Sequence, residues 1–104
     1  MDDRELLELA AKAADVELKY DSFGLSANSD REYNYWNPLI DDSDALRLAV
    51  KLGLQMYIFL ADDDIGISNT QVNRRFTEHH TNDPYAATRR AIVRAAAAIG
   101  KEMK

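Results

Sequence analysis

The last part of the sequence constrains the fold most, because it predicts one long helix that is rich in alanine. Asp83 and Pro84 form a helix start signal, since a capping carboxylate is followed by proline at the first helical position. From residue 85 to about residue 103 the apolar residues recur at helical spacing, and one stripe holds Ile92, Val93, Ala96, Ile99 and Met103. A helix this rich in alanine is expected to lie close against a sheet.

Two further helices are predicted nearer the start of the chain. Residues 3–14 are amphipathic, with acidic side chains in the first turn, where the helix dipole favours them. Residues 41–44 offer caps for a helix over residues 45–52, and Gly53 is expected to end it in the left-handed conformation.

The remaining segments predict strands and a layered fold. Strands are expected near residues 16–21, 25–28, 54–60, 65–68 and 72–78. The nearly all-apolar run 54–60 predicts a central strand covered on both faces, whereas residues 29–41 fit no period. The order α-β-β-α-β-β-β-α predicts one α+β or α/β layered sandwich domain over residues 1–104, with a central, mostly antiparallel sheet flanked by helices.

Composition excludes several classes of protein. The 104 residues include no cysteine, so no disulfide, thiolate nucleophile or zinc–thiolate site is expected. There is no apolar run long enough for a membrane span, and the acidic start lacks the order of a signal peptide. A cytosolic protein is therefore expected.

The net charge of −5 conceals a marked asymmetry. Residues 1–64 carry 15 acidic and 6 basic side chains, a net charge of −9, and residues 65–104 carry 3 acidic and 7 basic ones, a net charge of +4. This pattern indicates an anionic partner for the second part, pairing of the two parts within or between chains, or simply a solvated basic helix. Duplex DNA is disfavoured as a partner because an acidic chain repels phosphate.

No group of residues predicts a metal site or a catalytic centre. His79 and His80 are adjacent, so on an extended segment they point to opposite faces and do not share one metal ion. The aspartates of residues 41–44 and 62–64 lack the glycine and glutamate of a calcium loop. Phosphate-binding glycine loops and nucleophile motifs are absent as well. We therefore expect no enzyme activity, cofactor or bound metal.

Two clusters are candidate binding residues. Tyr33, Tyr35 and Trp36 crowd one irregular segment, and such aromatic rings bind partners or stack on nucleobases. Alternatively, Trp36 and one tyrosine plug the end of the core. The second cluster is basic and comprises Arg74, Arg75, Arg89, Arg90 and Arg94. With the aromatic rings it would suit an anionic, base-containing ligand or an acidic protein surface, and alternatively it is a solvated face.

Two segments of the chain are similar to a known family. They are residues 36–52, which begin Trp36-Asn37-Pro38, and residues 83–100, which begin Asp83-Pro84. Both resemble the phage ABA sandwich family, small proteins of tailed phages and prophages. The family often has glycine where this chain has Ser43. The resemblance implies an α-β-α layered fold and a viral accessory protein in the cytoplasm of an infected bacterium, and it implies no catalytic residues.

These observations together predict a binding protein without enzyme activity. We expect it to antagonise a bacterial antiviral defence complex, such as a CRISPR effector, through protein–protein contacts. The alternatives are sequestration of a nucleotide second messenger by an oligomer, and a role in phage packaging or morphogenesis. A homodimer is also expected, held by the apolar stripe of the first helix, the Tyr33–Trp36 segment and the unlike charges of the two parts.

Overall fold

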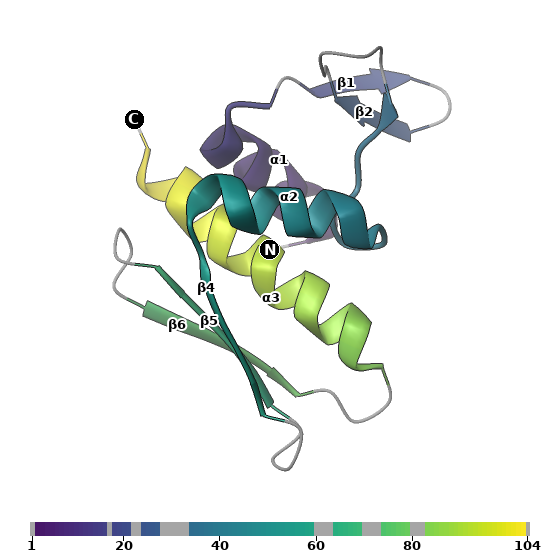
Figure 1. The fold of residues 1–104 in the computed structure, drawn as a ribbon. Helices are drawn as coiled ribbons and strands as arrows, with labels where there is room; N and C mark the ends of the chain where they lie inside the picture. Colours follow the sequence, from purple (N-terminus) through teal and green to yellow (C-terminus); the bar gives the residue numbers. More distant parts are fainter. Residues whose placement is uncertain are drawn as a thin grey trace.

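The structure, a computed structural model, describes residues 2–16, 18–21, 24–27, 34–59, 64–69, 74–79 and 83–103. Over these residues the helices are α1 (Asp3–Ala14), α2 (Asp42–Leu52) and α3 (Pro84–Glu102). The strands are β1 (Leu18–Asp21), β2 (Gly24–Ala27), β3 (Asn34–Tyr35), β4 (Gln55–Phe59), β5 (Asp64–Asn69) and β6 (Arg74–His79). The predicted mixture of helices and strands is confirmed (Figure 1). No described helix has the length and apolarity that a membrane span requires.

Local chemistry explains where the helices begin and end. Each described helix follows an aspartate whose carboxylate accepts a hydrogen bond from a backbone N–H, at 2.8 to 3.0 Å. The caps and their donors are Asp2 with Glu5, Asp41 with Asp44, and Asp83 with Ala86. Helix α2 ends at Gly53, whose φ of 64° is left-handed. The predicted caps of the second and third helices and the glycine stop are confirmed.

Helices α1 and α3 form the centre of the core. The buried side chains of α1 are Leu6, Leu7, Ala10, Ala11 and Ala14. Helix α3 packs against α1, and half of its buried residues are alanines. The two helices approach so closely that a Cβ added at Gly100 would overlap the carbonyl oxygen of Leu9. The predicted buried stripe of α3 is correct except at Met103, which follows the last helical residue and is 42% exposed.

Most of the apolar stripe of α1 is therefore covered within its own chain. We predicted that a sandwich of this size would leave part of the stripe free to hold a second copy. Helix α3 packs against α1, because short side chains let the two helices come close enough to bury Leu6 and Leu7, whereas Leu9 and Ala13 remain half-buried. The homodimer stays a prediction.

The larger sheet has the order β4-β5-β6, and both pairings are antiparallel. Strand β5 is central, and α3 packs against β5 and β6. Ile65 and Ile67 of β5 are fully buried. The prediction that residues 54–60 form the central strand is wrong: β4 is an edge strand. A uniformly apolar run does not distinguish a strand covered on both faces from an edge strand with both faces at the surface.

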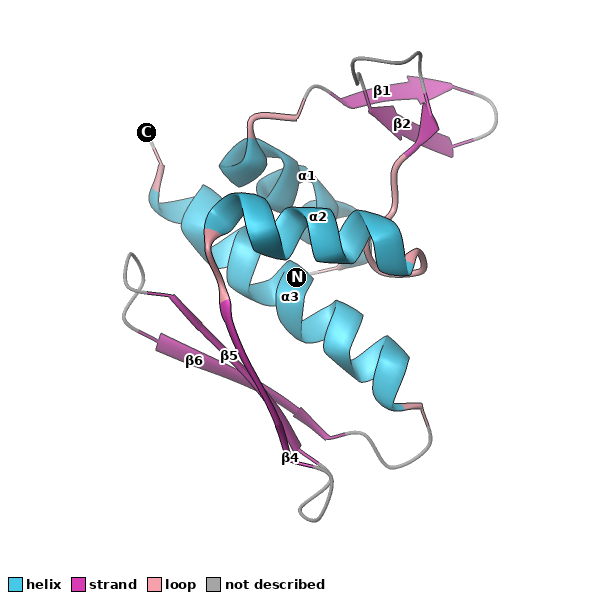
Figure 2. Ribbon diagram, viewed as in Figure 1, coloured by secondary structure: helices cyan, strands magenta, loops and turns pink. Residues whose placement is uncertain are grey.

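The predicted layering is also corrected. We expected one sheet flanked by helices, but the described strands form two sheets, and all three described helices lie on the same side of the β4-β5-β6 sheet (Figure 2). The small antiparallel sheet β1-β2-β3 lies on the opposite side of these helices. Strand β3 falls in the segment predicted to be irregular. It has only two residues, too few for a periodic pattern to reveal it.

Candidate binding groove

Of the predicted aromatic cluster, the structure describes the side chain of Trp36. Trp36 is half-buried and packs against the hydrophobic core. Tyr35 is the last residue of β3, and Tyr33 lies outside the described residues. For Trp36 the structure favours the alternative in which the ring closes one end of the core.

The predicted arginine cluster is divided between two elements. Arg74 and Arg75 begin β6, whereas Arg89, Arg90 and Arg94 lie on α3. Arg90 forms an ion pair with Asp3 of α1 at 3.1 Å. Arg89 donates from Nη1 to Asp42 of α2 at 2.6 Å. Two arginines of the basic helix thus form ion pairs with the acidic first part of the chain. This is pairing within one chain, one of the alternatives that the charge asymmetry indicated.

Arg89 also fixes the turn that precedes α2. Its Nε donates to the carbonyl oxygen of Leu39 at 2.9 Å, and its side chain is only 16% exposed. Within the turn the Leu39 N–H donates to Asn37 Oδ1 at 3.0 Å, and the Asn37 N–H donates to Asp44 Oδ2 at 2.9 Å. Pro38 is fully buried. The segment that carries the first part of the phage-family resemblance therefore has a structural role here.

Burial raises the pKa of the Asp44 carboxyl above its ordinary value of 3.8. The hydrogen bond from the Asn37 N–H opposes this effect, the charge of Asp41 adds to it, and the charge of Arg47 opposes it. Because the folded chain holds this proton more tightly than the unfolded chain, Asp44 lowers stability as the pH rises from below 3.8 through the raised pKa.

Replacing Asp44 by asparagine tests this pH dependence. The Asp44→Asn side chain keeps an oxygen that accepts from the Asn37 N–H but has no charge to desolvate. We compare the free energy of unfolding of Asp44→Asn with that of the wild type at each pH. The variant should become more stable relative to the wild type as the pH rises from about 3 to about 7. Urea denaturation at a series of pH values measures it, and a relative stability that falls over this interval would contradict the expectation.

The residues considered as metal ligands lie in two places in the described chain. Asp41 caps α2, with Asp42 and Asp44 in its first turn, whereas Asp64 of β5 stands opposite His79 of β6. Asp62, Asp63 and His80 lie outside the described residues. The described part of the chain contains no group of three or more His, Cys, Asp or Glu side chains arranged to hold a metal ion.

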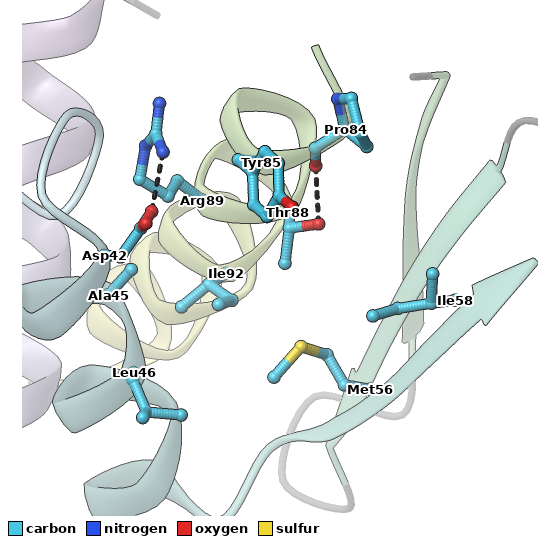
Figure 3. A pocket seen from close by; sticks show the side chains of 10 residues that line it. All are labelled: Asp42, Ala45, Leu46, Met56, Ile58, Pro84, Tyr85, Thr88, Arg89 and Ile92. Carbon is cyan, nitrogen blue, oxygen red and sulfur yellow. Dashed lines mark hydrogen bonds and ion pairs between the residues drawn. The ribbon is translucent and has the colours of Figure 1, made fainter. Parts of the chain in front are cut away.

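The structure contains a groove that sequence analysis did not identify. It has a volume of about 400 Å³ and lies between α2, the first turns of α3 and strand β4 (Figure 3). Its lining residues are Asp42, Ala45, Leu46, Met56, Ile58, Pro84, Tyr85, Thr88, Arg89 and Ile92. Because α3 packs over β5 and β6, the helix-facing side of β4 remains open to the groove.

Large apolar side chains at the groove are exposed. Leu46 on α2 is 57% exposed, Tyr85 at the start of α3 is 70% exposed, and Ile58 on β4 is 55% exposed. Met56 and Ile58 are alternate residues of β4 and therefore share one face of the strand, which Figure 3 shows directed toward the groove. The volume falls within the range of ordinary ligand sites.

The main polar groups of the groove already have partners within the chain. Arg89 is paired with Asp42, and the Thr88 hydroxyl donates to the carbonyl oxygen of Pro84 at 2.7 Å. An incoming anion would have to displace Asp42 from Arg89. Apolar side chains of a partner, in contrast, would meet Leu46, Ile58 and Tyr85 directly, so the groove suits apolar groups better than phosphate.

Sequence reasoning singled out Arg89 but missed the rest of the groove. One signal was present: Leu46 and Val50 lie one turn apart on α2, outside the buried face formed by Ala45, Leu48 and Ala49. The other half of the groove depends on β4 being an edge strand, which no local pattern predicts.

Comparison with known proteins identifies no relative. The chain matches no protein-family model, and no curated protein or solved structure compared with it is similar to it. The resemblance of residues 36–52 and 83–100 to the phage ABA sandwich family therefore stays a prediction.

Proposed function

We propose that this protein acts by binding a partner protein at the groove between α2, α3 and β4, without a catalytic step of its own. The observation that carries the proposal is the gathering of exposed apolar side chains from three elements around one open groove. Such gathering marks protein-interaction sites, whereas single exposed apolar residues are ordinary on any surface.

The phage resemblance supports a biological setting for this binding. In the cytoplasm of an infected bacterium, the partner would be a protein of the host's antiviral defence, such as a CRISPR effector. Occupying a working surface of that complex requires affinity and shape but no reactive group. The exposed apolar groups at the groove suit such a role, because buried apolar anchors dominate the affinity of protein interfaces.

Sequestration of a nucleotide second messenger has less support from the described residues. It would use arginines for the phosphates, but Arg89 and Arg90 pair with carboxylates of α1 and α2. Tyr85 is exposed enough to stack on a base, yet it stands among apolar side chains. A packaging or morphogenesis role would use the same groove with a virion protein as the partner.

A pair of lysine substitutions on α2 tests the proposal. Leu46→Lys places a charge in the groove, and Val50→Lys is the matched control, because Val50 is also exposed, one turn further along the helix, and does not line the groove. We expect Leu46→Lys to weaken partner binding by about tenfold or more, as removal of an interface anchor does, and Val50→Lys to have little effect.

The assay uses bacterial strains that each carry one defence system, challenged with a phage which that system blocks. Expression of the wild type and of Val50→Lys should restore phage plating on at least one strain, and Leu46→Lys should not. If the wild type restores plating on none of the strains, the defence role is wrong. If Leu46→Lys restores plating as well as the wild type, the groove is not the binding site.

A further inference from the structure

Strand β4 forms an uncharged edge of the β4-β5-β6 sheet. Residues Gln55–Phe59 include no charge and no proline. Soluble proteins usually protect an exposed edge with charged side chains, proline, a bulge or a covering element, because its outward backbone groups pair readily with another strand. The opposite edge, β6, begins with Arg74 and Arg75, so the two edges of the sheet differ in composition.

The two faces of β4 have different surroundings. Met56 and Ile58 line the groove and are 37% and 55% exposed. Gln55 and Tyr57 share the other face, where the hydroxyls of Tyr57 and Ser68 each donate to Gln55 Oε1 at 3.3 Å. The polar groups of β4 thus bond to one another on the far face, and the face toward the groove offers apolar side chains.

We propose that the partner segment bound in the groove is extended and adds a strand to the sheet beside β4. This inference rests on the proposed function, and it specifies the conformation and chemistry of the segment that the groove takes. Alternate side chains of a strand share one face. Apolar residues at every second position of the added strand therefore enter the groove between Leu46 of α2 and Ile58 of β4.

The backbone of β4 favours a strand over a helix as the occupant. In an edge strand, alternate residues direct their N–H and C=O groups away from the sheet. An apolar partner that fills the groove beside β4 removes water from these groups. A helix bonds its backbone groups internally and cannot replace that water, whereas an added strand bonds to each outward group in turn. An extended segment therefore avoids the cost of leaving backbone groups buried and unpaired.

The charge at one end of the groove indicates a basic residue in the same segment. The side chain of Asp42 is 73% exposed, whereas that of its partner Arg89 is 16% exposed. Asp41, the cap of α2, is exposed as well. Two exposed carboxylates and one largely buried guanidinium give this end a net negative charge. Because a carboxylate accepts more than one hydrogen bond, Asp42 can bind a lysine or arginine of the partner and still pair with Arg89.

Selection of peptides from a random library tests the conformation of the segment. Peptides that bind the wild type but not Leu46→Lys are retained, so that each depends on the groove, and circular dichroism checks that Leu46→Lys folds. We expect apolar residues at alternate positions, together with a lysine or arginine. Apolar residues at helical spacing would overturn the proposal, and so would peptides that repeat the sequence of β4, which would indicate a second copy of the chain.

Backbone methylation of one selected peptide provides a second measurement, by titration calorimetry. The N–H groups of an added strand point alternately toward β4 and away from it. Methylation of one alternate set should therefore weaken binding at least about tenfold, and methylation of the other set should have little effect. Equal losses from the two sets would contradict strand pairing.

A neutral substitution tests the charge. Asp42→Asn keeps an acceptor for Arg89, and it should weaken the binding of a basic peptide by about threefold to fivefold, as expected for an exposed ion pair. Glu102→Gln is the control, because it removes an exposed charge at the far end of α3. Unchanged affinity in Asp42→Asn would overturn the basic residue.

The selection separates failure of this inference from failure of the proposed function. Groove-dependent peptides with helical spacing would contradict only the added strand, because the groove would still bind a partner. A library that yields no groove-dependent peptide would contradict both.

Discussion

Gly100→Ala is expected to destabilise this protein by about 3 kcal/mol, at the upper end of the usual cost of overpacking. Alanine normally stabilises a helix by about 1 kcal/mol relative to glycine, so the expected sign is opposite to the helix propensity. The reason is that the new Cβ would overlap the carbonyl oxygen of Leu9 on α1. Because that oxygen belongs to the backbone, relief requires the whole helix to move.

Urea denaturation followed by circular dichroism measures this effect, with Lys101→Ala as the control. Lys101 is the next residue of the same helix and is exposed, so its replacement should change the free energy of unfolding by about 0.5 kcal/mol or less. If Gly100→Ala is as stable as the control, α1 and α3 are further apart than the structure shows.

The second large effect is expected at the centre of the β4-β5-β6 sheet. Ile67 is fully buried and pairs with Met56 on one side and Phe76 on the other. Ile67→Ala removes buried methyl and methylene groups and leaves a cavity beneath α3, a change that typically costs about 2 to 5 kcal/mol.

Ile58→Ala is the matched control for that substitution. The side chain and the sheet are the same, but Ile58 lies on the edge strand and is 55% exposed. It should therefore cost clearly less than Ile67→Ala, within about 1 kcal/mol of the wild type. Equal losses at the two positions would mean that β4 is covered as completely as β5, which would remove the basis for the groove.

Sequence reasoning succeeded where the determining interactions are local. The carboxylate of Asp83 and the ring of Pro84 act within a few residues, and so does the left-handed conformation of Gly53. Such signals can be recognised from a few neighbouring residues, without knowledge of the rest of the fold. The positions of the helices were therefore predictable to within a few residues.

Sequence reasoning failed where the place of an element in the fold depends on residues that are distant in the sequence. The run 54–60 is more apolar than the segment around Ile65 and Ile67, yet the latter is central, because the order of strands decides burial. The same limit applies to Arg89, whose partners Leu39 and Asp42 are 50 and 47 residues away in the sequence. The groove requires α2 and β4 to be placed together, so no local pattern indicated it.

The unequal edges of the β4-β5-β6 sheet have a consequence for how large an assembly can grow. A sheet that can pair with other chains at both edges forms filaments, because every added copy exposes a new edge like the one that it covered. The two edges of this sheet differ: β4 contains no charged residue, whereas β6 begins with Arg74 and Arg75. A strand that paired with β4 would leave β6 as the outer edge, so such pairing would extend the sheet at one edge only.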